Sequence, residues 1–260
     1  RGGRLDKRDI DGLAALARDP DVVALEEDRI ERTQLRETIP IVRADQARDA
    51  GFDGRGWAVA IIDTGVDASL PFLAGKVVSE ACFSREGDCP NGQTTQLGAG
   101  AGAPCEYAQG CAHGTHVAGI ATGSGTALRG VAPNADLISL QVFSRFEGDA
   151  CDGDDEDPCT ASYVSDITAA LERVFALRNV FSIAAVNISI GGSQTYSSPA
   201  ACDAQDGARR RAIENLRSVG IPTIVASGNS GSSNGLTSSA CLSAAIGVGA
   251  TDDADRVARF

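Results

Sequence analysis

The stretch Trp57-Ala-Val-Ala-Ile-Ile62, followed directly by Asp63, decides the fold class. A continuous apolar run of this length is typical of a strand in a parallel sheet that is covered on both faces. Outward from this run, four more segments have the same apolar character and are predicted to be similar strands: residues 135–142, 184–190, 222–226 and 244–248.

Helical patterns lie between these predicted strands. In residues 163–178, apolar side chains recur at helical spacing, with Ser162 placed as an N-cap. A second helix is predicted from about residue 207 to 219, ended by Gly220. Strands that alternate with helices predict an α/β fold, a parallel β-sheet flanked by helices on both faces in three α/β/α layers.

The composition narrows the class of protein. The 260 residues are 43% hydrophobic and 22% charged, with a formal net charge of −12. This acidic balance argues against a nucleic-acid partner, which selects for a basic face. No apolar run approaches the roughly 18 residues of a membrane span, so no membrane partner is predicted. The eight cysteines include no CxxC pair, which favours disulfides and export over zinc or thiol redox chemistry. Free buried cysteines in a cytosolic protein are the alternative.

Two motifs could carry chemistry. Asp63 ends the first strand, where α/β sheets place ligands, although it could also cap the next turn. The second motif is His113-Gly-Thr-His-Val-Ala-Gly119, which holds the two histidines of the chain. Its small residues would let a helix pack closely while His113 faces a cleft. A metal site formed by His113 and His116 is an alternative, but neither a third ligand nor the glutamate of HExxH is evident.

These two motifs, in this order, resemble the first active-site motifs of the subtilisin-like serine peptidases, whose triad runs Asp, His, Ser along the chain. The resemblance implies that Asp63 orients and stabilises the general base His113, and that His116 is a packed helix residue. It extends from about residue 41 to 260 and implies a secreted serine endopeptidase with polypeptide substrates. A catalytically inactive pseudo-peptidase that binds peptides or a partner is the alternative.

Two later segments extend the resemblance. Val186-Asn-Ile-Ser-Ile-Gly-Gly192 is similar to the family's substrate-pairing strand, so Ser189, Ile190 and Gly191 are expected to line the S1 side. Ile224-Val-Ala-Ser-Gly-Asn-Ser230 is similar to the segment that carries the oxyanion-hole asparagine. Asn229 is therefore the expected oxyanion donor, although a turn asparagine is the alternative. Substrate contacts are expected for the three preceding residues, Ala226, Ser227 and Gly228.

The family's nucleophile segment, Gly-Thr-Ser-x-Ala, does not occur in the sequence. Three serines lie before the last predicted strand, too early by alignment to be the nucleophile: Ser238, Ser239 and Ser243. With no methionine at position 1 either, we expect a precursor truncated at both ends, with its nucleophile beyond residue 260 and the chain alone inactive. Residues 1–35 resemble the end of an inhibitory propeptide with its linker, and residues 36–260 the peptidase domain. The short helix and strand expected within residues 10–32 would belong to this propeptide, and the maturation cut is expected between Arg29 and Pro40. An ordinary N-terminal extension is the alternative.

Three segments are read as loop insertions: residues 82–111, 147–160 and 229–241. The chemistry requires no cofactor, and a structural calcium at the acidic residues 152–157 is an open possibility beside a solvated loop. In the resembled family, an aspartate calcium ligand is often found where this chain has Phe72, which argues against a second calcium site there.

Proximity favours a Cys151–Cys159 disulfide, and Cys202–Cys241 would tie a helix to the loop after Asn229. The other four cysteines leave three pairings open. The chain is expected to be a monomer.

Overall fold

The computed structural model describes residues 35–126, 129–151, 157–192 and 194–258. The chain divides into two units after Gln34, and the described residues belong to the second unit, Leu35–Phe260. The helix and strand expected within residues 10–32 lie outside the described residues. The first described element is helix α2 (Leu35–Ile41).

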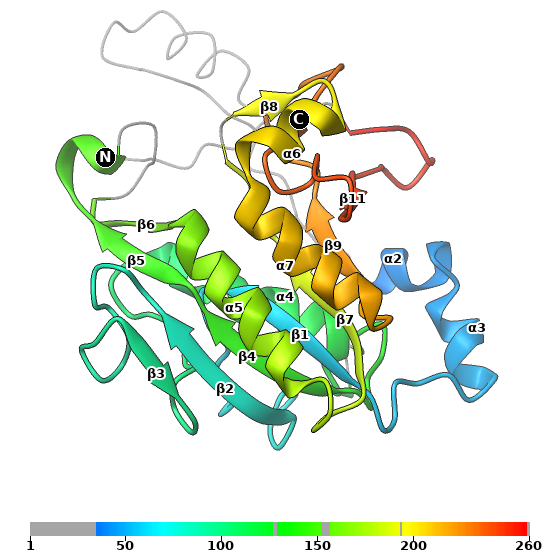
Figure 1. Cartoon of the computed structure of the whole chain (residues 1–260). Helices are drawn as coiled ribbons and strands as arrows, with labels where there is room; N and C mark the ends of the chain where they lie inside the picture. The colour runs from blue at the N-terminus through cyan, green and yellow to red at the C-terminus, as the bar shows by residue number, and fades with distance from the viewer. Residues whose placement is uncertain (1–34, 127–128, 152–156, 193, 259–260) are drawn as a thin grey trace, which may run out of the picture. The chain divides into compact units, whose positions relative to one another are not determined.

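Seven strands form the central sheet, in the order β11-β9-β7-β1-β4-β2-β3 (Figure 1). Six of them pair in parallel, and the short edge strand β3 is antiparallel to β2. The five strands predicted from apolar runs are present, and β2 and β3 are additional. Their bounds are β1 Ala58–Asp63, β2 Val77–Phe83, β3 Thr95–Leu97, β4 Asp136–Gln141, β7 Ile183–Ile188, β9 Thr223–Ala226 and β11 Ile246–Val248.

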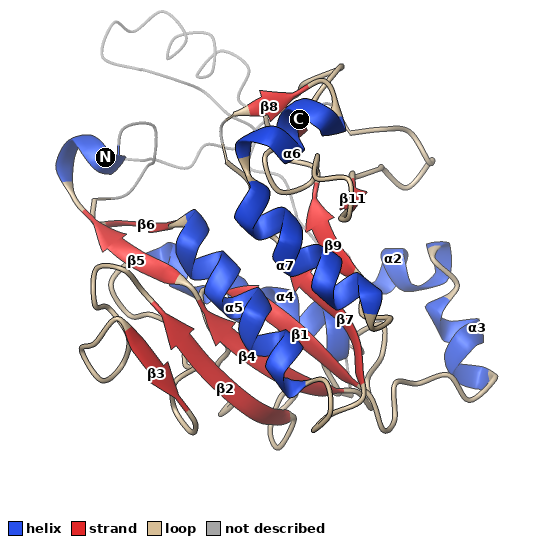
Figure 2. Cartoon of the chain, in the orientation of Figure 1, coloured by secondary structure: helices blue, strands red, loops and turns tan. Residues whose placement is uncertain are grey.

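Helices cover both faces of this sheet because its central strands are apolar on both sides. In β1, Ala60 and Ile62 belong to the large core cluster that contains the buried faces of α5 (Val164–Leu177) and α7 (Gly207–Ser218). Ile61 points the other way and packs in a second cluster with residues of α4 (His113–Thr122). Figures 1 and 2 show α5 and α7 crossing the same face of the sheet. The predicted three-layer α/β/α architecture is confirmed.

Smaller elements surround the sheet. The β5–β6 hairpin and the β8–β10 pair are antiparallel. None of the described helices is both long and apolar enough to cross a membrane. The remaining bounds are α3 Ala44–Asp49, α6 Pro199–Gln205, the 3-10 helices η1 Gln109–Ala112 and η2 Gly148–Cys151, β5 Phe143–Phe146, β6 Cys159–Ser162, β8 Thr195–Tyr196 and β10 Leu236–Thr237.

The helix ends confirm one prediction and correct another. Gly220 lies just beyond α7 with a φ of 81°, which the predicted helix-ending glycine requires. Ser162 is not the N-cap of α5. Tyr163 holds that position, and the Ser162 hydroxyl donates to the Val142 carbonyl at 2.7 Å instead. Ser162 is the last residue of β6, and its acceptor, Val142, lies between β4 and β5.

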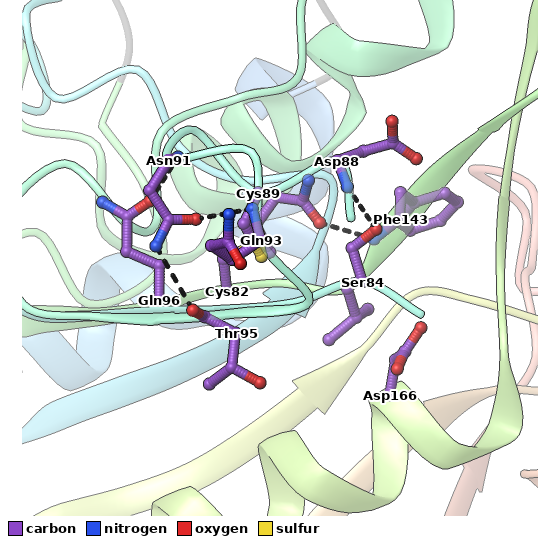
Figure 3. Close-up of a disulfide and its surroundings, with 12 residues drawn as sticks. Cys82, Ser84, Asp88, Cys89, Asn91, Gln93, Thr95, Gln96, Phe143 and Asp166 are labelled. Carbon is purple, nitrogen blue, oxygen red and sulfur yellow. Dashed lines mark hydrogen bonds between the residues drawn. A yellow bond between two sulfur atoms is a disulfide. The ribbon is translucent and has the colours of Figure 1, made fainter. Parts of the chain in front are cut away.

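All eight cysteines form disulfides. Cys151–Cys159 and Cys202–Cys241 pair as predicted. The four cysteines left open pair as Cys82–Cys89 and Cys105–Cys111. Figure 3 shows Cys82–Cys89 at the base of a loop that is held by its own hydrogen bonds, including Asp88 N–H to the Ser84 hydroxyl at 2.9 Å.

The long-range disulfide is expected to stabilise the fold more than the short ones. Cys202–Cys241 closes 39 residues, whereas Cys82–Cys89 closes 7. Loop-closure entropy predicts losses of about 4 and about 2 kcal/mol in the free energy of unfolding when each pair is replaced by serines. Urea unfolding of the two double variants measures both losses. Equal losses would contradict this explanation.

Candidate active site

The carboxyl ends of three neighbouring strands form the edge of the sheet that holds the candidate site. In the parallel register, Ile62 of β1 is opposite Ile188 of β7, and Ile188 is opposite Val225 of β9. The next residues along these strands are Asp63, Ser189 and Ala226. Three segments that are far apart in the sequence therefore end side by side, at the edge where open α/β sheets bind ligands.

Asp63 and His113 are in direct contact at this edge. The Asp63 side chain is fully buried, and its Oδ1 lies 2.7 Å from His113 Nδ1. The same oxygen accepts the Thr64 N–H at 2.8 Å. His113 is the first residue of α4, and its side chain is 47% exposed. Since Nδ1 faces a carboxylate, the tautomer with its proton on Nδ1 is favoured, and Nε2 is left to accept a proton.

Two glycines allow α4 to begin against the end of β1. A Cβ at Gly114 would lie 2.4 Å from the Gly65 carbonyl oxygen and 3.0 Å from Asp63 Cβ. Gly65 itself has a φ of 98°, and a Cβ there would meet the Ala103 carbonyl oxygen at 2.2 Å. Only glycine fits at either position without a shift of the backbone. The expectation that small residues let this helix pack closely is thus met.

The contact with Asp63 changes the acidity of His113. The hydrogen bond to the Asp63 carboxylate raises the pKa of the imidazole above its usual value, while partial burial opposes the rise and the carboxylate charge adds to it. The raised pKa means that the imidazolium stabilises the folded state below about pH 6.5, and that this contribution is lost as the pH rises through the raised pKa.

This shift predicts a pH dependence. A histidine that serves as a general base does so in its neutral form, so any activity that depends on His113 in this role is expected to rise with pH through a midpoint above about 6.5. Asp63→Asn should lower that midpoint. NMR titration of the imidazole measures it, with the two histidine signals assigned by a His116→Gln variant. A midpoint that is the same in the Asp63→Asn variant would contradict the stated cause.

The expected substrate residues lie at and just beyond the carboxyl ends of β7 and β9. Asn187 holds the first of them, since its side-chain N–H donates to the Ser189 hydroxyl at 2.9 Å. Gly191 and Gly228 both pack on Thr237. A Cβ at Gly191 would lie 3.3 Å from Thr237 Oγ1, and a Cβ at Gly228 would lie 2.2 Å from Thr237 Cγ2. Thr237 thus brings the two predicted substrate segments together. Ile190 and Ser227 lie in the same segments and are partly buried.

Asn229 lies three residues after the end of β9 and is exposed. Among the described residues, no hydrogen bond joins it to Asp63 or His113. Its place at the carboxyl edge of β9, next but one to β1, is compatible with an oxyanion donor, which need not contact the acid–base pair.

Two of the serines in the late loop are engaged away from the Asp63–His113 pair. Ser239 is 2% exposed and accepts a hydrogen bond from Arg209 Nη1 at 2.6 Å. The Ser243 hydroxyl donates to Asp203 Oδ2 at 2.7 Å. These contacts support the expectation that neither is the nucleophile.

The alternative metal sites gain no support from side-chain placement. Within the described ranges, no group of three or more His, Cys, Asp or Glu side chains is arranged to hold an ion. Phe72 packs against α4, since a Cβ at Gly119 would lie 3.1 Å from its Cε2. Most of the acidic segment proposed for calcium, residues 152–156, lies outside the described residues.

Sequence reasoning missed the role of Thr64. Its side chain is buried, donates to the Cys111 carbonyl at 2.9 Å and accepts the Gly114 N–H at 2.9 Å. It therefore joins the end of β1 to the start of α4. The sequence feature that points to Thr64 is its position directly after Asp63. This position alone does not reveal a hydrogen-bond partner 47 residues away.

Comparison with known proteins gives a consistent result. A sequence model of the Subtilase family matches residues 54–260. An alkaline protease of Alkalihalobacillus alcalophilus is 32% identical over 262 residues, covering 98% of this chain and 55% of that protein. Subtilisin DY of Bacillus licheniformis is 30% identical, with 85% and 66% covered.

Solved structures agree with the sequence matches. A psychrophilic protease, S41, superposes with a TM-score of 0.56 at 27% identity, covering 80% of this chain and 59% of that one. Sphericase gives a TM-score of 0.55 at 27% identity, with 76% and 54% covered. The chain thus spans only part of the length of these relatives. Since the family model matches most of the chain, the chain belongs to the subtilase family of serine peptidases.

Proposed function

We propose that the full-length protein containing this chain is a secreted serine endopeptidase. The observation that carries the proposal is the 2.7 Å contact between buried Asp63 and His113 at the carboxyl end of β1. A fold alone does not require a buried carboxylate that faces a half-exposed imidazole. This pair does fit a general base together with the group that orients it.

The proposed mechanism uses His113 twice. Its Nε2 takes the proton from a serine hydroxyl as that oxygen attacks the scissile carbonyl, and then gives the proton to the leaving amine. Asp63 holds Nδ1–H throughout and stabilises the imidazolium between the two transfers. We place the nucleophilic serine outside residues 1–260, because the family's Gly-Thr-Ser-x-Ala segment does not occur within them.

The substrate in this proposal is a polypeptide in extended conformation. Residues 189–191 continue from β7 and could pair with it, and Gly191 would let its backbone approach. Asn229 would donate its amide to the developing oxyanion. Ala226, Ser227 and Gly228 would complete this side of the site.

The proposal that the protein is a secreted serine endopeptidase also covers its maturation and its location. Residues 1–35 are proposed to be the end of an inhibitory propeptide, the protein's own first partner, and the mature enzyme is proposed to be a monomer. Four disulfides support an oxidising, extracellular location. One relative is named as the minor extracellular protease Vpr of Bacillus subtilis. The chemistry of Asp63 and His113 needs no cofactor, and a calcium ion bound by residues 152–157 would have only a structural role.

A peptide assay with two inhibitors tests the proposal. The full-length protein should hydrolyse a chromogenic peptide, lose activity to a sulfonyl fluoride that modifies the serine, and keep initial activity in a zinc chelator. Peptide binding without hydrolysis would contradict the proposal and favour a pseudo-peptidase. Inactivation by the zinc chelator alone would favour a metal hydrolase.

Removal of the oxyanion donor should slow turnover more than it weakens binding. For Asn229→Ala we expect kcat to fall about 10²–10³-fold, a magnitude carried over from the corresponding subtilisin donor, with KM nearly unchanged. The matched control is Asn215→Ala, at an exposed position on α7. Steady-state kinetics of both variants measure kcat and KM. If Asn229→Ala changed only KM and left kcat unchanged, the result would argue for a turn asparagine.

A further inference from the structure

The short disulfide loop Cys105–Cys111 lies immediately before His113. The disulfide closes a separation of 6 residues, and Cys111 belongs to η1 (Gln109–Ala112), which is followed directly by α4. Because His113 is the first residue of α4, the position of this loop affects where α4 begins and therefore where the His113 imidazole lies.

Both cysteines of this disulfide are hydrogen-bonded to one residue, Thr64. The Cys105 N–H donates to the Thr64 carbonyl at 3.1 Å, and the Thr64 hydroxyl donates to the Cys111 carbonyl at 2.9 Å. The loop therefore holds both the backbone and the side chain of the residue that follows Asp63. Thr64 and Cys111 are both buried, so water does not compete for these bonds.

The same threonine connects the two members of the acid–base pair. Its N–H donates to Asp63 Oδ1, the oxygen that faces His113, and its hydroxyl accepts the N–H of Gly114, next to His113. A continuous set of bonds thus runs from the disulfide through Thr64 to Asp63 on one side and to the start of α4 on the other.

Close backbone packing supports the loop from two further sides. The Val66 N–H donates to the Gly102 carbonyl at 2.8 Å, just before the loop. A Cβ at Gly110, within the loop, would lie 2.8 Å from Thr160 Oγ1 of β6. These contacts hold the chain at Gly110 and just before Cys105.

We propose that the Cys105–Cys111 loop and Thr64 form a positioning element that holds His113 against Asp63. None of these residues is placed in contact with substrate. They act through the pair, by fixing the end of β1 and the first turn of α4 in one register. This inference rests on the proposed function for its kinetic consequences, whereas the placement of His113 can be measured independently.

The first test opens the loop while keeping its composition nearly constant. In the full-length protein, replacing Cys105 and Cys111 by serine should lower kcat about 10–100-fold with KM nearly unchanged, because a small misplacement of the base slows the chemical step. The titration midpoint of His113 should fall, since the Asp63 hydrogen bond that raises it is weakened. The matched control replaces Cys82 and Cys89, whose loop is of similar length and is hydrogen-bonded within itself (Figure 3) and to Ser144, Arg145 and Asp166, but not to Thr64 or His113.

The second test removes the hydroxyl at position 64. Thr64→Val keeps the shape but loses the bonds to Cys111 and Gly114, and should reproduce both effects of the open loop. Thr64→Ser keeps the hydroxyl and should restore most of kcat and the raised midpoint. This pair keeps the inference testable if the disulfide variant does not fold.

The outcomes separate this inference from the proposed function. Should the wild-type protein not hydrolyse peptides, the proposed function fails, but the His113 midpoints still test the positioning role. The inference is overturned if the open loop shifts the midpoint no more than the Cys82/Cys89 control does. It is equally overturned if the valine and serine variants at position 64 behave alike.

Discussion

His113→Ala in the full-length protein is expected to lower kcat for peptide hydrolysis about 10⁶-fold, with KM far less affected. The magnitude is carried over from subtilisin, where loss of the triad histidine has about this effect. The physical reason is that no other described group near Asp63 could take the proton of a serine. Steady-state or single-turnover kinetics of the purified variant measure the loss.

The matched control is His116→Ala. His116 lies three residues further along α4 and is exposed, so the expectation that it is a packed helix residue is wrong. The proposed mechanism gives it no proton to move, so its variant should keep wild-type kcat. Comparable losses in the two histidine variants would contradict the mechanism and favour a metal held by both.

The second large effect is expected for Asp63→Asn. An asparagine keeps the size of the side chain but can present an N–H to His113 Nδ1, which then holds the wrong tautomer. We expect kcat to fall about 10⁴-fold, as in serine peptidases with this substitution. The loss should be smaller than that of His113→Ala, because the base itself is still present.

A neighbouring carboxylate serves as the control for this variant. Asp67 lies four residues further along, and its side chain accepts the Ser69 N–H at 2.9 Å and the Ser69 hydroxyl at 2.6 Å. Asp67→Asn should leave both kcat and the His113 titration midpoint unchanged. If the two variants lowered kcat equally, a general loss of negative charge would explain the effect better than orientation of the imidazole.

The buried strands were predictable because their sequences are apolar over their whole length. β1 needs both faces covered, and its apolar run reflects this directly. β2 was not recognised, since its sequence, Val-Val-Ser-Glu-Ala-Cys-Phe, mixes polar and apolar residues near the sheet edge. The β5–β6 hairpin was hidden because its two strands are separated by the acidic insertion.

The site could be predicted where local motifs define it. Asp63 and His113 were expected to be partners, and their contact is present. The role of Thr64 depends on a carbonyl 47 residues away and on one of three possible cysteine pairings. Sequence spacing cannot choose among such pairings, because it does not show which loops the fold brings together. Ser162 does not cap α5 for a related reason: its hydroxyl donates to the carbonyl of Val142, 20 residues away in the sequence.

The central claim is that His113, oriented by Asp63, activates a serine. Labelling with a fluorophosphonate probe tests it most directly, because the probe reacts covalently with a serine that a neighbouring base has activated. In the wild-type full-length protein we expect rapid labelling of a single serine outside residues 1–260, mapped by mass spectrometry, and its near-complete loss in His113→Ala. Labelling at the same rate in that variant, or none in the wild type, would contradict the claim.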